Sequence, residues 1–135
     1  MRGYLLVSHG YFAKELKESV KMIAGEVENL EACCLEKTDG PESFSVKLQE
    51  AEKKLSGCDE LFVFADMLGG SPCNTAFQYF QAKENVHIIA GMNFPMLLTT
   101  LLTPDIPVSE IIAAGQHGVI DVRAFSAANA SDVDD

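Results

Sequence analysis

The sequence lacks several features that would place it in large classes of proteins. No run approaches the ~20 apolar residues of a membrane helix, and no basic segment followed by an apolar one opens the chain. Basic residues are few, because 10 lysines and arginines stand against 20 acidic residues, for a net charge of −10. Such a surface repels nucleic acid and anionic membranes. We therefore expect a cytoplasmic protein that binds no nucleic acid and suits basic protein partners.

Motifs for several common chemistries are also missing. The four cysteines form no C-x-x-C pair, so we interpret them as reduced thiols, with Cys33 and Cys34 on opposite faces of a strand. His87 and His117 lack the spacing of metal ligands, and neither a metal nor another cofactor is predicted. No G-x-x-x-x-G-K, G-x-G-x-x-G or G-x-S-x-G motif is present. This argues against a nucleotide kinase, a dinucleotide-binding fold and a nucleophile-elbow hydrolase.

What the sequence does contain is a regular alternation of short apolar runs with helical patterns. Strands are expected at residues 4–8, 29–35, 61–65, 86–90 and 119–125, and helices at 12–24, 41–56, 72–80, 96–102 and 108–114. Alternation at this spacing predicts a doubly wound α/β fold, with a mostly parallel sheet flanked by helices. We expect one domain over residues 1–125, followed by an acidic, flexible tail at 126–135.

Three polar or glycine-rich loops follow the carboxyl ends of predicted strands. His9 follows the first strand, Asp66 follows "LFVFA", and the loop "GMNFP" follows the fourth strand. In doubly wound sheets these loops form the ligand crevice. If the first and third strands are neighbours, His9 and Asp66 face each other across that crevice.

A histidine beside a carboxylate is suited to nucleophilic chemistry. The carboxylate accepts a hydrogen bond from one ring nitrogen, which fixes the tautomer and leaves the other nitrogen nucleophilic. The nearby "LGGSP" predicts a helix with Ser71 as its N-cap and Pro72 at its first position, whose N–H groups favour a bound oxyanion. We therefore predict a histidine that accepts and carries a phosphoryl group. The candidate phosphate-binding residues are Leu68, Gly69, Gly70 and Ser71.

Each of these residues also has a purely structural interpretation. His9 is then a solvated loop residue, Asp66 a turn-former or cap, and Ser71 only the cap of its helix. Gly69 and Gly70 then serve only to make a turn. Cys73, near the predicted helix start, is either a reactive thiol of lowered pKa or a packed one.

Taken together, "LLVSHGYFAKEL", "DMLGGSPCNTAF" and "GMNFPMLL" resemble the enzyme IIA domain of the mannose family of the bacterial phosphoenolpyruvate-dependent sugar phosphotransferase system, from about Gly3 to Val122. The resemblance implies that His9 receives a phosphoryl group on Nε2 from the histidine-containing phosphocarrier protein, with Asp66 holding Nδ1. His9 then passes the group to a separate enzyme IIB during sugar uptake through the membrane subunits IIC and IID. Cys73 departs from the family pattern, which has a bulkier apolar residue there.

The resemblance also implies a homodimer in which the last strand, "VIDVRAF", crosses to the partner and lies antiparallel on its sheet. Two alternatives remain open. One is the phosphotransfer subunit of a dihydroxyacetone kinase, which has a similar fold and histidine. The other is a non-catalytic regulatory binding module of the same fold.

Overall fold

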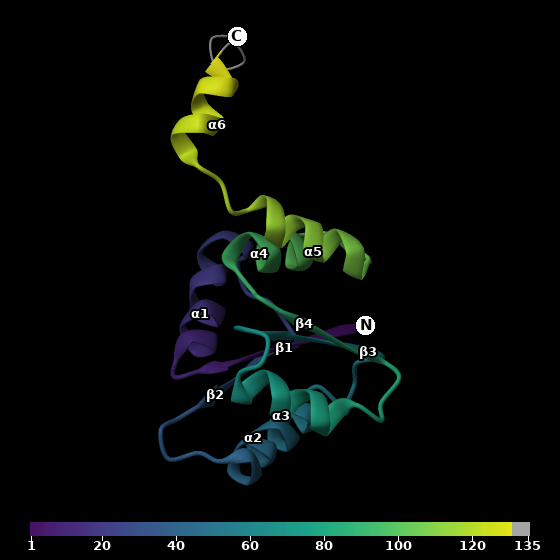
Figure 1. Ribbon diagram of the computed structural model, residues 1–135. Coiled ribbons are helices and arrows are strands. Elements are labelled where there is room, and N and C mark those ends of the chain that lie inside the picture. Colours follow the sequence, from purple (N-terminus) through teal and green to yellow (C-terminus); the bar gives the residue numbers. More distant parts are fainter. Residues whose placement is uncertain (131–135) are drawn as a thin grey trace.

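The computed structural model describes residues 1–130, and a four-stranded sheet forms its centre. The strands are β1 (Arg2–His9), β2 (Leu30–Leu35), β3 (Glu60–Ala65) and β4 (Val86–Ala90). They are all parallel and lie in the order β2-β1-β3-β4 (Figure 1). The first and third strands are therefore neighbours, which is the condition under which we predicted that His9 and Asp66 face each other.

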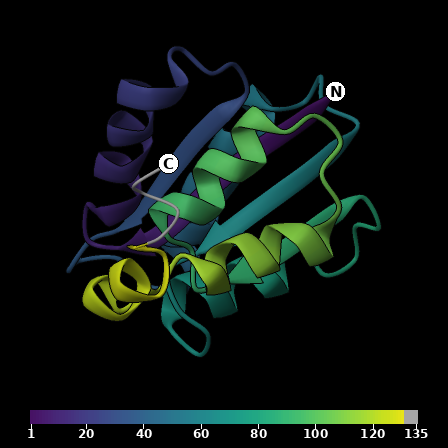
Figure 2. The same cartoon turned by 90° about the horizontal axis from the view of Figure 1, so that it is seen from above.

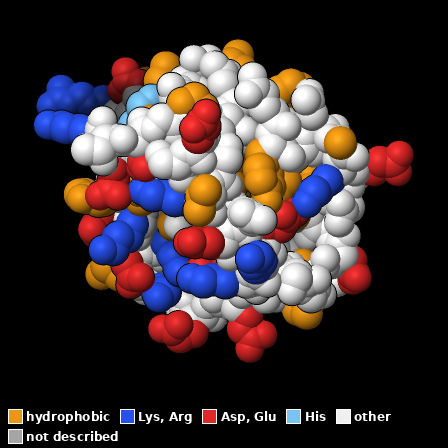
Figure 3. Space-filling model, turned by 90° about the horizontal axis from the view of Figure 1, so that it is seen from below, with side chains coloured by type: hydrophobic (Ala, Val, Ile, Leu, Met, Phe, Trp, Pro, Cys, Tyr) orange, Lys and Arg blue, Asp and Glu red, His pale blue; other side chains and the backbone are white. Residues whose placement is uncertain are grey.

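Helices cover both faces of the sheet. One face carries α1 (Phe12–Ala24), α4 (Phe94–Leu102) and α5 (Val108–His117), and the other carries α2 (Pro41–Lys54) and α3 (Ser71–Phe80) (Figures 1 and 2). Each face has its own core of apolar side chains, which confirms the doubly wound α/β class. Basic and acidic side chains intermingle on the outer surface of the α2 and α3 layer (Figure 3).

The alternation of side chains along β1 decides where the residues at its end point. Leu5 and Val7 belong to the core beneath α2 and α3, whereas Leu6 belongs to the core beneath α1 and α4. Successive residues of a strand point to opposite faces. Ser8 therefore points toward α1, and His9 points toward the side that holds α3.

Two helix ends differ from the sequence-based prediction. Gly70, not Ser71, is the N-cap of α3, so Ser71 is the first helical residue and Pro72 the second. A side chain at the cap position would collide with His9, as described below, which explains the glycine. The helix predicted to end near Gly115 continues to His117. A Cβ on Gly115 would lie 2.5 Å from Met96 Cε, so this glycine serves close packing of α5 on α4 rather than termination.

The predicted final strand at 119–125 is absent from the single chain, where the segment contains no strand. Its second half belongs to a short helix, α6 (Val122–Ala128), which stands away from the body at the end of a short linker (Figure 1). Asp121 caps this helix by accepting a hydrogen bond from the Ala124 amide at 3.1 Å. With no second sheet beside it, the segment satisfies its backbone locally. Exchange of the segment between subunits therefore stays a prediction.

The predicted tail at 126–135 is only partly described. Residues 126–128 belong to α6, and 131–135 lie outside the described residues. Within residues 1–130, no helix is both long enough and apolar enough to cross a membrane. The four cysteines are free, and Cys33 and Cys34 pack against opposite cores as predicted.

Candidate active site

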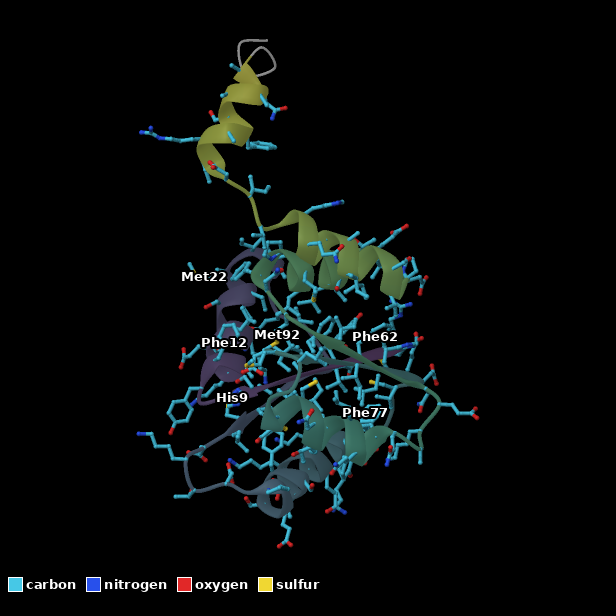
Figure 4. The ribbon with its side chains drawn as sticks, in the orientation of Figure 1. His9, Phe12, Met22, Phe62, Phe77 and Met92 are labelled. Carbon is cyan, nitrogen blue, oxygen red and sulfur yellow. The ribbon has the colours of Figure 1, made fainter. Side chains whose placement is uncertain are left out.

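His9 is the last residue of β1, and its side chain stands at the carboxyl edge of the sheet (Figure 4). The ring nitrogen Nδ1 lies 2.8 Å from Asp66 Oδ2, and the His9 backbone N–H donates to the same oxygen at 2.9 Å. An ionised carboxylate only accepts hydrogen bonds, so Nδ1 carries the proton and Nε2 bears the lone pair. The two residues that sequence reasoning paired across 57 positions are thus in direct contact.

Asp66 is itself held in place on both sides. Its backbone N–H donates to the Val7 carbonyl at 3.2 Å, which continues the pairing of β3 with β1 past the end of the strand. The other carboxylate oxygen, Oδ1, accepts from the Met67 amide at 2.9 Å. The side chain is 14% exposed, while that of His9 is 48% exposed. The geometry therefore combines a fixed acceptor with an accessible imidazole.

Gly70 brings the start of α3 against the imidazole. A Cβ built on Gly70 would lie 2.6 Å from His9 Cε1 and 3.3 Å from Nε2, so only glycine permits this approach. The first turn of a helix leaves N–H groups without intrahelical partners, and its dipole favours negative charge. The nitrogen with the free lone pair thus lies beside an end of α3 that suits an anion.

The other predicted phosphate-binding residues surround this end of α3. Gly69 has a φ of +84°, Ser71 is exposed at the first helical position, and the side chain of Leu68 is 80% exposed. The Asn74 side-chain amide donates to the Gly69 carbonyl at 3.3 Å, and its backbone N–H makes a helical hydrogen bond to the Gly70 carbonyl at 2.9 Å. The stretch 68–71 is therefore a turn that leads into the helix, and a phosphate-binding role for these four residues stays a prediction.

Sequence reasoning missed Ser8, the residue before His9, which ties the end of β1 to the start of α1. Ser8 is fully buried, and its hydroxyl accepts from the Ala13 amide in the first turn of α1 at 2.7 Å. Between them, Gly10 has a φ of +55°, which a glycine adopts without strain. The sequence signal that could have found Ser8 is a serine at the end of an otherwise apolar run, just before a predicted helix. The N-cap of that helix, Tyr11, makes no side-chain hydrogen bond to the helix start.

The remaining polar candidates lie elsewhere or are packed. Cys73 is buried, and burial raises the pKa of its thiol above the usual 9.0, with the Gly69 N–H opposing that rise. Burial and the raised pKa favour the packed-thiol interpretation of Cys73. His87 Nε2 lies 2.7 Å from Glu60 Oε2, and its ring stacks on Phe62. No group of three metal-ligating side chains occurs within the described residues.

The site and the fold define a doubly wound α/β protein with a histidine–carboxylate pair at the carboxyl edge of its sheet, beside a helix start. Residues 3–113 match the family EIIA-man, described as the PTS system fructose IIA component. The chain belongs to this family of phosphotransferase-system IIA components.

Proteins with assigned functions that are similar in sequence to this chain are also components of the phosphotransferase system. The chain is 34% identical over 101 residues to the PTS system fructose-specific EIIA component of Bacillus subtilis, covering 75% of this chain and 69% of that one. It is 32% identical over 123 residues to the mannose-specific EIIAB component of Escherichia coli, covering 87% of this chain but only 38% of that protein. The chain thus spans well under half the length of the EIIAB protein.

Solved structures show the same fold. The PTS IIA protein associated with the fucose utilization operon of Streptococcus pneumoniae superposes with a TM-score of 0.84 at 28% identity, covering 91% of this chain and 94% of that one. The mannose/sorbose-specific IIA subunit of Enterococcus faecalis gives a TM-score of 0.80, also at 28% identity, covering 89% and 93%.

Proposed function

We propose that the protein is the phosphoryl-carrying IIA subunit of a sugar phosphotransferase system, and that His9 is the residue that carries the phosphoryl group. The observation that carries the proposal is the orientation of one imidazole. Its Nδ1 is 2.8 Å from a carboxylate, and its Nε2 lies beside Gly70 at the start of α3. Membership of the EIIA-man family supports the same role.

The chemistry is an exchange of nitrogen–phosphorus bonds. The lone pair of His9 Nε2 attacks the phosphorus carried by the histidine of the phosphocarrier protein. The N–P bond of the donor breaks as the new N–P bond forms, and the donor imidazole keeps the electron pair. The proton on His9 Nδ1 stays in its hydrogen bond to Asp66, which balances the positive charge that develops on the ring.

The backbone turn at 68–71 has a role in holding the product. A phosphorylated histidine carries roughly −2 of charge, and a helix N-terminus stabilises such a charge by about 0.3–1 kcal/mol. Gly70, which lies against the imidazole, and the exposed Ser71 would donate to the phosphate, with Leu68 and Gly69 forming the turn. The same step in reverse passes the group to a separate, cytoplasmic enzyme IIB, upstream of the membrane subunits IIC and IID.

Phosphorylation in a reconstituted relay tests this proposal. The purified chain is incubated with phosphoenolpyruvate, enzyme I and the phosphocarrier protein, and acid-labile phosphate is counted. We expect about one phosphate per chain, with none on His9→Ala and full labelling of His87→Ala as the matched control. Equal labelling of His9→Ala and the parent would contradict the proposal.

A chase of the labelled protein separates the alternatives. Enzyme IIB should remove the phosphate, whereas a subunit of dihydroxyacetone kinase should not. Removal by the kinase subunit alone would favour that second phosphotransfer role. A chain that binds partners in a pull-down but never becomes labelled would instead be a regulatory binding module.

We also propose that the chain forms a homodimer by exchanging residues 119–125. The outer edge of β4 is unpaired within the described residues, and a cavity of about 440 Å³ lies along it between β4 and α5. The exchanged segment presents exposed apolar side chains, such as Val119 at 81% and Val122 at 75%. Pairing with the partner's β4 would cover both. Light scattering that finds a monomer at micromolar concentration would contradict the dimer.

A further inference from the structure

Tyr11 is an exposed aromatic residue two positions after His9. Its side chain is 61% exposed and belongs to neither core. Its hydroxyl nevertheless donates a hydrogen bond to Glu36 Oε1 at 3.1 Å. That bond raises the pKa of Tyr11 above its usual value of 10.0. The Tyr11 ring is therefore mostly exposed to solvent but held in position by the hydrogen bond of its hydroxyl.

Glu36 is fixed in turn by Lys47. The Lys47 ammonium donates to Glu36 Oε2 at 2.9 Å, to Asp39 Oδ2 at 2.7 Å and to the Cys34 carbonyl at 2.9 Å. Hydrogen bonds to the two carboxylates raise the pKa of Lys47 to about 12. Glu36, which holds Tyr11, is therefore fixed by the Lys47 ammonium. Lys47 belongs to α2, and its three N–H donors bind acceptors at the end of β2 and in the loop that follows.

A second Tyr–Glu–Lys group in the same protein serves a different purpose. Tyr79 donates to Glu52 Oε1 at 2.8 Å, and Lys83 pairs with the other carboxylate oxygen. Tyr79, however, packs against the core, and burial is the main cause that raises its pKa to about 12. That group joins α3 to α2. The group at Tyr11 holds a ring that faces solvent, so core packing does not explain it.

The residue that carries the tethered ring is two positions from the reacting histidine, at the same edge of the sheet. His9 pairs in register with Leu35, the residue before Glu36, and the Gly10 amide donates to the Leu35 carbonyl at 2.8 Å. Gly10, Tyr11 and residues 36–38 together line a cavity of about 330 Å³. A standard protein interface covers roughly 800 Å² on each partner. We expect a protein that reaches His9 Nε2 with an interface of this size to contact Tyr11 as well.

Exposed apolar side chains continue this surface around His9. Phe12 is 47% exposed, Met67 is 54% exposed and Leu68 is 80% exposed. Phe12 follows Tyr11 on α1, and Met67 and Leu68 follow Asp66. The surface therefore suits a partner whose phosphohistidine is surrounded by apolar side chains. A rigid aromatic ring contributes contact area at low entropic cost, which is why tyrosine is common among the residues that dominate binding energy.

We propose that Tyr11, held by Glu36 and Lys47, is a binding residue for the phosphocarrier protein that donates the phosphoryl group to His9. The proposal rests on the proposed function of His9. It assigns Tyr11 to partner affinity rather than to the bond exchange, because its hydroxyl is occupied by Glu36.

Kinetics with two phosphoryl donors test this role. One donor is the phosphorylated phosphocarrier protein, and the other is phosphoramidate, a small donor that needs no docking surface. We expect Tyr11→Ala to raise KM for the protein donor about tenfold and to change kcat less. Tyr11→Phe and Lys47→Met, which keep the ring but release it, should each raise KM about threefold. The rate with phosphoramidate should stay near that of the parent.

Tyr79→Phe is the matched control, because it removes the same hydroxyl from the other Tyr–Glu–Lys group. It should leave KM unchanged and lower only the melting temperature. The proposal is overturned if Tyr11→Ala keeps the parental KM, if Tyr79→Phe raises KM as much as Tyr11→Phe, or if Tyr11→Ala loses equal rate with both donors. A parent chain that accepts phosphate from neither donor would instead overturn the proposed function, and the role of Tyr11 with it.

Discussion

Two histidine–carboxylate pairs lie at opposite ends of the same sheet. At the carboxyl end, His9 Nδ1 is 2.8 Å from Asp66, and toward the amino end, His87 Nε2 is 2.7 Å from Glu60. By distance alone the pairs are equivalent. Their surroundings differ, and only the pair at the carboxyl end has the geometry that we propose for a phosphoryl carrier.

In the pair at the amino end, Arg2 and Phe62 occupy the positions around His87 and Glu60. Arg2 donates to the other oxygen of Glu60 at 3.0 Å and lies 4.5 Å above the Phe62 ring. The His87 ring stacks on Phe62 at 4.7 Å. At the carboxyl end, the free nitrogen of His9 lies instead beside Gly70 at a helix start. A paired histidine is thus a candidate carrier only where its second nitrogen meets an anion site.

The largest difference between the pairs should appear when each carboxylate is neutralised. Asp66→Asn leaves the His9 tautomer unfixed, and we expect phosphoryl transfer to slow by about 10- to 100-fold. Glu60→Gln, the matched change, should lower the melting temperature and leave the transfer rate within about twofold of the parent. Stopped-quench assays of both variants measure this. Equal losses would mean that the two pairs are functionally alike.

A methyl group beside the imidazole should have the next largest effect. Gly70→Ala places a Cβ 2.6 Å from His9 Cε1, so the ring must move, and we expect transfer to slow about tenfold. Gly40, the N-cap of α2, has nothing within 4 Å of its Cβ position. Gly40→Ala is therefore the control and should transfer at the parental rate. Unimpaired transfer by Gly70→Ala would disprove the close approach.

Loss of the buried hydroxyl of Ser8, the residue before His9, should mainly lower the free energy of unfolding. Ser8→Ala leaves the Ala13 amide without its acceptor, at a cost of about 1–2 kcal/mol in the free energy of unfolding. Ser45, whose exposed hydroxyl donates within its own helix, offers the control. Ser45→Ala should be nearly neutral in urea unfolding. If the two variants unfold at the same urea concentration, Ser8 does not support this turn.

The smallest effect concerns pH and the pair at the amino end. The hydrogen bond from His87, with Arg2 nearby, holds the pKa of Glu60 below its usual 4.5. A lowered pKa in the folded state stabilises the protein above pH 4.5, and this contribution disappears as the pH falls through the lowered value. The stability difference between the parent and Glu60→Gln should therefore shrink in urea titrations from about pH 6 to about pH 3. A constant difference would contradict this.

Much of the site followed from the sequence because it depends on local rules. Strands that alternate with helices imply a parallel sheet, and the ends of parallel strands meet at one edge. That placed His9 and Asp66 at one edge, and their contact followed once β1 and β3 proved to be neighbours. Ser71 and Pro72 indicated the helix start, although the cap is Gly70 rather than Ser71, because close contact with His9 excludes a side chain.

The parts that sequence reasoning missed depend on distant residues. Tyr11 is tethered by Glu36, 25 positions away, and no local pattern links the two. The strand predicted at 119–125 is absent from the single chain, in which the segment has no neighbouring edge to pair with. Pairing of "VIDVRAF" with a partner chain stays a prediction.

The position of the phosphorus on the imidazole tests the central claim most directly. The chain is labelled with ¹⁵N in its histidines, phosphorylated through the phosphocarrier protein, and examined by NMR for coupling between ³¹P and ¹⁵N. We predict coupling to Nε2 of His9, with the proton retained on Nδ1 toward Asp66. Phosphorus on Nδ1 of His9, or on His87 or His117, would contradict the account.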